Sequence, residues 1–337
     1  SNANDILADD ANAGYLLASG GRQENELNAN VLVDSGSGFS ESANLDFHPY
    51  AYIDEDVFYT DTVVDIVNGK DLDLVNTGTI AQIGTELIRV DSINQDSTGA
   101  YVSTTIGRGI LDTVPQKHDS GTFIAFWDEY AISDNERYVS GESVDVKLLT
   151  TQNASILGQA SAPTDNVNFD SRAIRPYPPG DLKIDNLSYP EPYTWLASHT
   201  LTWAHRDRLQ QTDGNLYDYT EGDIGPESGQ EYIVEGIAIV GDSVENLDSN
   251  DSNQDTGAER EKFLDVNVGS DRLYTFDIDS GTFDSIYSEP PEGTTAILLG
   301  VKSQRDGYDS WQYPQIRLQF PGFTDSVGDS VGQIIDS

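Results

Sequence analysis

The chain of 337 residues has no cysteine, no methionine and only four histidines. Without cysteine it can form no disulfide, thiolate metal site or cysteine nucleophile, so its rigidity must come from packing and hydrogen bonding. The histidines are too few and too scattered to form a metal site from neighbouring residues. The sequence also lacks a nucleotide-binding glycine pattern, a zinc-protease motif and a serine-hydrolase elbow. These absences predict a protein without catalytic activity and without a cofactor.

Positive charge is scarce, since 18 Lys and Arg stand against 58 Asp and Glu and the formal net charge is -40. A surface this acidic repels phosphate backbones and anionic lipid headgroups, which argues against nucleic acid as a partner. No window holds 18 consecutive apolar residues, and no charged segment followed by an apolar one opens the chain. We therefore expect neither membrane insertion nor a signal peptide.

The beginning of the chain carries no initiator methionine. Its first three residues, Ser1-Asn2-Ala3, resemble the residues that remain after a protease cleavage. We therefore expect the chain to be a piece of a longer polypeptide.

Large side chains are abundant enough for a packed core. Hydrophobic residues make up 37% of the chain and aromatic residues 9%, with 17 tyrosines, which distinguishes it from a disordered acidic tail. From position 50 onward, short runs of alternating apolar residues recur every 8 to 15 residues between Gly, Asn, Asp and Ser. This spacing is typical of an all-β protein. The expected fold is a β-rich, barrel-like N-terminal domain followed by a fibronectin type III or immunoglobulin-like sandwich.

The expected boundaries follow composition. Residues 1–174 form the β-rich domain. Within it, residues 1–44 are a loosely structured lead-in rich in Asn, Gly, Ser and Asp, with one or two strands expected at the apolar runs 15–17 and 31–33. Residues 175–180 contain three prolines in four positions, which fixes an extended backbone and predicts a stiff linker. Six or seven strands are expected in residues 181–321, the number in an immunoglobulin-like sandwich, and residues 322–337 are expected to be a flexible linker.

Several local patterns make narrower predictions. Residues 232–240 are apolar on both faces and predict a central strand, whereas residues 72–75 predict a short strand. Asp306-Gly307 between two alternating runs predicts a tight hairpin turn. Helical periodicity is confined to residues 128–134 and 260–263, each long enough for one or two turns.

Four short motifs occur in a fixed order along the chain. The first is a strand containing Glu86, followed by Arg108-Gly109, Thr113, His118 and Gly121. The second is the proline-rich segment 175–182. The third is a strand with Trp203 that continues into His205-Arg206-Asp207-Arg208, and the fourth is a hairpin with Asp306, Gly307 and Trp311.

Together these motifs resemble the C-terminal part of tail-tip proteins, the central fibre or baseplate hub, of long-tailed bacteriophages, prophages and gene transfer agents. The resemblance covers residues 50–320 and departs from the family pattern at Asp112, where the family has a second glycine. It implies a structural protein with a fibronectin type III-like domain. It also implies a location in the virion tail, assembly in the bacterial host cytoplasm as a homo-oligomer, and other tail-tip proteins as partners. Contact with a host-surface polysaccharide or protein is a further implication.

The motif residues themselves favour structural pairing over chemistry. His118 is isolated from any nucleophile, and pairing with Arg108 or Glu86 would pin a turn. Arg206 and Arg208 belong to a group of basic residues at 172–183, 206–208 and 302–317. Their guanidinium groups suit bidentate pairs with carboxylates such as Asp207 and Asp306, at loop ends or at an interface.

One acidic segment could bind calcium. Asp251, Asn253 and Asp255 have the alternate spacing of an EF-hand loop, but Gly257 comes one position late. Lys262 also stands where a bidentate glutamate would be required. A weak calcium site therefore competes with a hydrated acidic loop that binds no ion.

Carbohydrate chemistry supplies two alternative functions. Tyr189, Tyr193 and Trp195 could form a platform for stacking sugars, as in a carbohydrate-binding adhesin, whereas Trp203 and Trp311 are predicted to be core residues. A tail-associated glycan hydrolase would need a pair of carboxylates, and 58 acidic residues make any single pair uninformative. Glu235 has the most apolar neighbours, but we expect it to face solvent on an edge strand.

Overall fold

The computed structural model describes residues 13–22, 25–189, 198–210, 216–221, 223–240, 259–277 and 294–319. In these ranges the regular elements are β-strands and three short 3-10 helices, so the expectation of an all-β protein is confirmed. The chain divides into two compact units, and each unit is made of three separate segments of the chain. The first comprises Ser1–Asp181, Ala204–Glu231 and Lys302–Pro314, and the second comprises Leu182–Trp203, Tyr232–Val301 and Gln315–Ser337.

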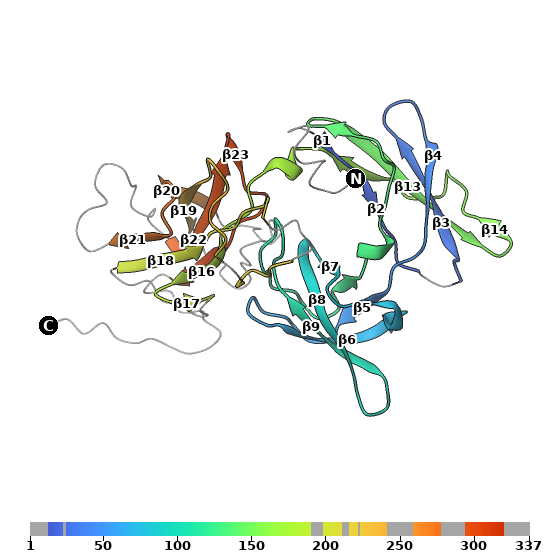
Figure 1. The fold of residues 1–337 in the computed structure, drawn as a ribbon, viewed down its shortest axis with the longest axis horizontal. Coiled ribbons are helices and arrows are strands. Elements are labelled where there is room, and N and C mark those ends of the chain that lie inside the picture. Colours follow the sequence, from blue (N-terminus) through green and yellow to red (C-terminus); the bar gives the residue numbers. More distant parts are fainter. Residues whose placement is uncertain are drawn as a thin grey trace. The chain divides into compact units, whose positions relative to one another are not determined.

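The first unit contains a closed antiparallel barrel with the strand order β10-β5-β6-β9-β8-β7 (Figure 1). Its strands are β5 (Tyr50–Ile53), β6 (Val63–Lys70), β7 (Ile80–Ile83), β8 (Glu86–Gln95), β9 (Tyr101–Gly107) and β10 (Phe123–Ala125). Strand alternation fills the interior: Ile88 and Val90 are fully buried, whereas Arg89 between them points outward. The barrel-like character predicted for the N-terminal domain is therefore confirmed.

A second sheet of the first unit has the order β14-β13-β3-β4, with β15 also paired to β13. Its strands are β3 (Asn28–Asp34), β4 (Ser40–Leu45), β13 (Ser143–Gln152), β14 (Ser155–Ile156) and β15 (Asp165–Asn168). Two small sheets pair β1 (Ala13–Gly14) with β12 (Tyr138–Val139), and β2 (Leu17–Ala18) with β11 (Ile132–Ser133). Ala29, Val31 and Val33 of β3 are buried in a separate apolar core. This part of the predicted lead-in is therefore ordered.

Two local predictions for the first unit differ from the structure. Residues 72–75, predicted as a strand, contain the 3-10 helix η1 (Leu72–Leu74), and Asp71 before it has a φ of 55°. A left-handed residue at this point turns the chain out of the extended conformation. Residues 128–134, predicted as a helical turn, contain the 3-10 helix η2 (Asp128–Tyr130) and then β11.

The proline-rich segment packs inside the first unit. It follows the 3-10 helix η3 (Arg172–Ile174), and Pro176, Pro178 and Pro179 are buried. At its end, a Cβ on Gly180 would lie 2.8 Å from the carbonyl oxygen of Tyr219, so the close approach of the two backbones requires glycine. The segment is thus held by packing as well as by its fixed proline φ angles.

The remaining strands form two sheets with the topology of a fibronectin type III sandwich (Figure 1). One sheet has the order β17-β16-β18-β21 and the other β20-β19-β22, with β23 and β24 both paired to β22. The strands are β16 (Gly180–Ile184), β17 (Leu187–Ser188), β18 (Ser198–Ala204), β19 (Glu231–Val240), β20 (Glu259–Asn267), β21 (Leu273–Asp277), β22 (Thr294–Arg305), β23 (Tyr308–Asp309) and β24 (Gln315–Gln319). The Trp203 and Tyr232 rings, one from each sheet, meet at 5.7 Å.

The local predictions for the sandwich have mixed outcomes. Strand β19 lies between β20 and β22, as predicted for a central strand. Asp306 and Gly307 have φ angles of 52° and 83°, which confirms the predicted tight turn. The helical turn predicted near residues 260–263 is wrong, because these residues pair with β19 in strand β20.

Glu235 is also placed differently from our prediction. Its side chain is buried on the central strand β19, and its Oε2 lies 2.7 Å from the Nζ of Lys262 on β20. The ion pair explains how a carboxylate can be accommodated at a buried position.

Candidate functional site

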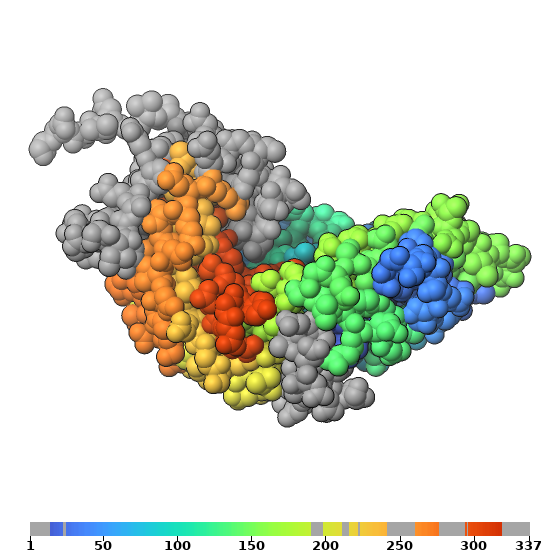
Figure 2. Space-filling view, turned by 90° about the horizontal axis from the view of Figure 1, so that it is seen from above, coloured from blue at the N-terminus to red at the C-terminus, as the bar shows by residue number. Residues whose placement is uncertain are grey.

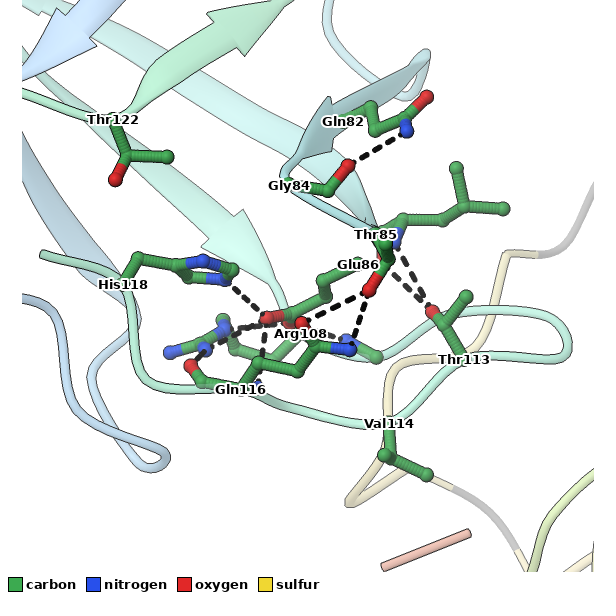
Figure 3. Close-up of polar contacts among 12 residues, drawn as sticks. Gln82, Gly84, Thr85, Glu86, Arg108, Thr113, Val114, Gln116, His118 and Thr122 are labelled. Carbon is green, nitrogen blue, oxygen red and sulfur yellow. Dashed lines mark hydrogen bonds and ion pairs between the residues drawn. The ribbon is translucent and has the colours of Figure 1, made fainter. Parts of the chain in front are cut away.

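The Glu86 carboxylate is the centre of a buried polar network (Figure 3). Its Oε1 accepts hydrogen bonds from Arg108 Nε at 2.7 Å and from the Gly109 amide at 2.9 Å. Its Oε2 accepts from Arg108 Nη2 at 2.8 Å and from the Gln116 amide at 3.0 Å, and lies 2.7 Å from His118 Nε2. Five partners use essentially all of the lone pairs that a carboxylate offers.

The barrel explains why these residues meet. Glu86 begins β8, and the pairing of Arg89 with Gly107 places the end of β9 beside it, so Arg108 emerges next to the carboxylate. The following loop turns back through Gly109 and Leu111, whose φ angles are 53° and 55°. The loop thus returns the Gln116 amide and His118 to the other side of the same carboxylate.

Two further contacts hold the loop in place. Thr113 Oγ1 accepts a hydrogen bond from the Leu87 amide at 3.1 Å and donates one to the Ile110 carbonyl at 2.8 Å. His118 forms an isolated antiparallel bridge with Val57. The loop is therefore tied to β8 on one side and to the β5–β6 connection on the other.

The Arg108 guanidinium is satisfied at every donor. Besides the two bonds to Glu86, its Nη1 donates to the Phe58 carbonyl at 2.7 Å and the Asp61 carbonyl at 3.0 Å. Its Nη2 also donates to the Gln116 carbonyl at 2.5 Å. A buried ion pair with complete hydrogen bonding stabilises the fold, and removing one of its two partners is strongly destabilising.

We predict that this network makes stability depend on acid pH. Burial alone would raise the pKa of Glu86, but the charge and hydrogen bonds of Arg108, with the bond to His118, lower it from 4.5 to about 2. A carboxyl with a lowered folded-state pKa stabilises the fold above the unfolded pKa, and this contribution is lost as the pH falls from 4.5 toward 2. The difference in free energy of unfolding between wild type and Glu86→Gln, measured with urea, should shrink by roughly 3 kcal/mol as the pH falls from about 5 to about 2. A difference that is constant across this range would contradict the assignment.

A second cluster gathers five arginines of the first unit, which we call the arginine cluster: Arg172, Arg175, Arg206, Arg208 and Arg305. Arg172 pairs bidentately with Asp112, with Nε–Oδ2 at 2.5 Å and Nη2–Oδ1 at 2.9 Å. Arg208 pairs in the same way with Glu227, at 3.2 Å and 2.8 Å, and Glu227 also contacts Arg305. Asp112, the departure from the family pattern, is therefore an ion-pair partner.

Backbone carbonyls of the proline-rich region connect this cluster to the last hairpin. Arg305 Nη2 donates to the Ile174 carbonyl at 2.7 Å, and Arg208 Nη1 donates to the Ala173 carbonyl at 3.1 Å. Arg175 Nη1 donates to the Asp309 carbonyl at 3.2 Å. In Figure 2 the red surface of the last described segment accordingly adjoins light-green surface.

Trp311 is not the core residue that we predicted. Its side chain is 40% exposed, and its ring stacks with Arg172 at 5.1 Å and with Arg175 at 5.6 Å. Stacking of an indole on guanidinium groups holds the ring in place without burying it. Trp203, in contrast, is buried as predicted.

Contacts within the first unit join the arginine cluster to the Glu86 network. Gln312 Oε1 accepts from the Val114 amide at 3.1 Å, and its Nε2 donates to the Thr85 carbonyl at 3.2 Å. Arg206 Nη1 lies 3.3 Å from the Thr113 carbonyl. All four sequence motifs thus contribute residues to one connected set of contacts.

The other motif residues form turns of the chain. Gly121, with a φ of 84°, turns the chain into β10, and its amide donates to the Ile53 carbonyl at 2.8 Å. Asp306 and Gly307 form the hairpin between β22 and β23. Among the described residues, the hydrogen bonds to the Glu86 carboxylate come from Arg108, Gly109, Gln116 and His118 and from none of these three.

Most residues of the two ligand sites predicted from the sequence lie outside the described residues, so both sites stay predictions. Tyr189 is partly buried with a φ of 40°, and Tyr193 and Trp195 lie outside the described residues. Asp251, Asn253 and Asp255 also lie outside them. Among the residues that the structure does describe, no group of three or more His, Asp or Glu side chains is arranged to hold a metal ion. The same residues include no helix that could cross a membrane.

Several contributors were not identified from the sequence. Glu227 and Gln312 have no local pattern that marks them, since their partners lie 19 or more positions away. Gln116 contributes through its backbone, which no side-chain motif can reveal. Asp112 did carry a signal, because it replaces a glycine in the family pattern.

Comparisons with known proteins add little to these observations. No family model and no curated protein matches the chain. Among solved structures, the FN1-FN3 domains of chicken CNTN1 are 9% identical with a TM-score of 0.18, covering 88% of this chain and 66% of that one. A biofilm associated protein BSP domain is 12% identical with a TM-score of 0.18, covering 82% and 30%. Escherichia coli alpha-2-macroglobulin activated by porcine elastase is 11% identical with a TM-score of 0.19, covering 91% and 25%. Superpositions this poor carry no argument about function.

Proposed function

We propose that the chain is a non-catalytic structural component of the tail tip of a long-tailed bacteriophage or prophage. The observation that carries the proposal is that residues of all four family-like motifs meet in one connected set of contacts in the first unit. Motif residues that bind one another, and not a substrate, are what a structural role requires.

The electrostatics of the Glu86 network support a role without catalysis. A general acid needs a carboxyl whose pKa is raised toward neutrality, whereas the pKa of Glu86 is lowered to about 2. A nucleophile or base needs an unshared lone pair facing a substrate, whereas both Glu86 oxygens are bound by the protein. The network therefore suits mechanical stability.

The proposal includes the setting of the protein. Its partners are other tail-tip proteins, with copies of itself in the assembled tail, and a host-surface polysaccharide or protein is a second class of partner. A net charge of -40 disfavours nucleic acid. No cofactor is needed, and calcium enters only through the acidic segment around Asp251.

The test uses the virus or prophage that encodes the chain. Antibodies against the chain should label the distal end of purified tails in electron microscopy, and deletion of the whole chain, residues 1–337, should abolish tail assembly or host adsorption. Tails that carry no label, or a deletion that leaves both assembly and adsorption intact, would overturn the proposal. Release of reducing sugar from host polysaccharide, lost when one carboxylate is replaced, would instead favour the glycan hydrolase. Calcium-dependent glycan binding without cleavage would favour the adhesin.

A further inference from the structure

Four arginines of the first unit direct Nε and Nη2 at the two oxygens of one carboxylate: Arg89, Arg108, Arg172 and Arg208. Their carboxylate partners are, in the same order, Asp91, Glu86, Asp112 and Glu227. For Arg108 and Arg208, which are buried, the bidentate arrangement compensates for the removal of the charge from water.

Arg206 is buried as well, but it has no such carboxylate partner among the described residues. Its side chain is 2% exposed, yet its Nε and Nη2 have no hydrogen-bond partner in the part of the chain that the structure describes. Its polar contact is one long bond, 3.3 Å, from Nη1 to the Thr113 carbonyl, and the Tyr177 ring lies 5.8 Å from its guanidinium carbon. Burial accordingly lowers the pKa of Arg206, although tyrosine and aspartate neighbours oppose this.

The position of Arg206 links the segment Ala204–Glu231 to the barrel. A Cβ on Gly180 would lie 3.2 Å from Arg206 Cδ, so the side chain is tightly enclosed. Nearby, the Tyr219 amide donates to the Arg108 carbonyl at 2.8 Å, and the Asp181 amide donates to the Tyr219 carbonyl at 3.0 Å. Gly180 lies against both the Tyr219 carbonyl oxygen and the Arg206 side chain, so these bonds and the buried guanidinium group belong to one packed region.

An unpaired buried guanidinium favours the open state. When the segment separates from the barrel, water reaches Nε and Nη2 and restores their hydrogen bonds. The buried ion pairs Arg108–Glu86 and Arg208–Glu227 stay intact on opening, because each has both partners on the same side of the contact. We propose that the docking of residues 204–210 and 216–221 on the barrel is a releasable latch, and that the unpaired guanidinium of Arg206 sets how readily it opens.

The latch lies where the chain passes from the second unit into the first and back again. The chain leaves the second unit at Trp203, enters the latched segment, and returns to the second unit at Tyr232. Opening therefore frees from the barrel the segment that connects to the sandwich at both of its ends. The inference does not depend on the tail-tip proposal, because it concerns the folded chain alone.

Native-state hydrogen exchange of the full chain tests the latch with Arg206→Met. A flexible apolar side chain of similar length keeps the packing and removes the charge, so the closed state should become more stable. Exchange of the Tyr219 and Asp181 amides should slow by about tenfold or more, and Tm should rise by roughly 2–8 °C.

Arg208→Met is the matched control, because it removes a neighbouring arginine whose guanidinium group pairs bidentately with Glu227. It should speed the same exchange and lower Tm, so the two variants move in opposite directions. Faster or unchanged exchange in Arg206→Met would overturn the latch. Arg206→Leu is a second variant that tests whether an effect is specific to methionine. If both variants are destabilised or fail to fold, Arg206 stabilises the closed state and the proposal is wrong.

Discussion

Replacement of Glu86 by glutamine is expected to lower the free energy of unfolding by about 3–5 kcal/mol, as for other buried ion pairs that lose one partner. The substitution keeps the shape of the side chain but leaves the Arg108 charge buried without a counter-charge. It also places an amide nitrogen opposite one set of backbone donors, either the Gly109 or the Gln116 amide. Urea unfolding at neutral pH measures the loss.

Glu221→Gln is the matched control for this prediction. Glu221 also pairs with an arginine, with Oε2 2.6 Å from Arg89 Nη1, but its side chain is 44% exposed. Water screens such a pair, so the loss should stay below about 1 kcal/mol. Similar losses in the two variants would show that burial of the Glu86 network has no special importance.

Gly109→Ala should have the second largest effect, a loss of about 2–5 kcal/mol. The residue has a φ of 53°, where an alanine is strained, and a Cβ would lie 2.6 Å from Pro115 Cδ and 2.8 Å from Pro115 N. The backbone must shift to relieve this overlap, and the shift would displace the amide that donates to Glu86. Thermal and urea unfolding measure the effect.

Gly121→Ala is the control that separates backbone strain at a positive φ from steric overlap of the added Cβ. Its φ of 84° is also in the left-handed region, but a Cβ there would meet no atom within 4 Å. The loss should be about 1 kcal/mol, the strain alone. If Gly109→Ala cost no more than Gly121→Ala, the loop would be looser than the contacts around Pro115 indicate.

Much of the fold could be predicted because strand alternation and turn chemistry are local. The apolar run 232–240 and the Asp306-Gly307 turn each depend on a few adjacent residues. The short elements were harder, since the strand β20 contains charged residues at 259–262 and is held in the sheet by pairing with β19. Such tertiary pairing overrides local helical preference.

The candidate site was only partly predictable. Pairing of His118 with Glu86 was one of two options open from the sequence, because both residues belong to a single motif. The pairing of Arg208 with Glu227 and the exposure of Trp311 depend on how distant segments meet. Local patterns contain no information about such contacts, and the proline-rich segment, expected as a linker, is instead buried beside them.

The central claim is that the Glu86 network is a rigid structural element of the first unit. Hydrogen exchange of the Gly109 and Gln116 amides tests it most directly, because both amides lie in a loop and donate to the Glu86 carboxylate. The network predicts exchange as slow as that of the buried barrel strand residues Ile88 and Val90. Exchange as fast as that of the Gly36 amide, which donates to Asp34 in an exposed turn, would contradict the claim.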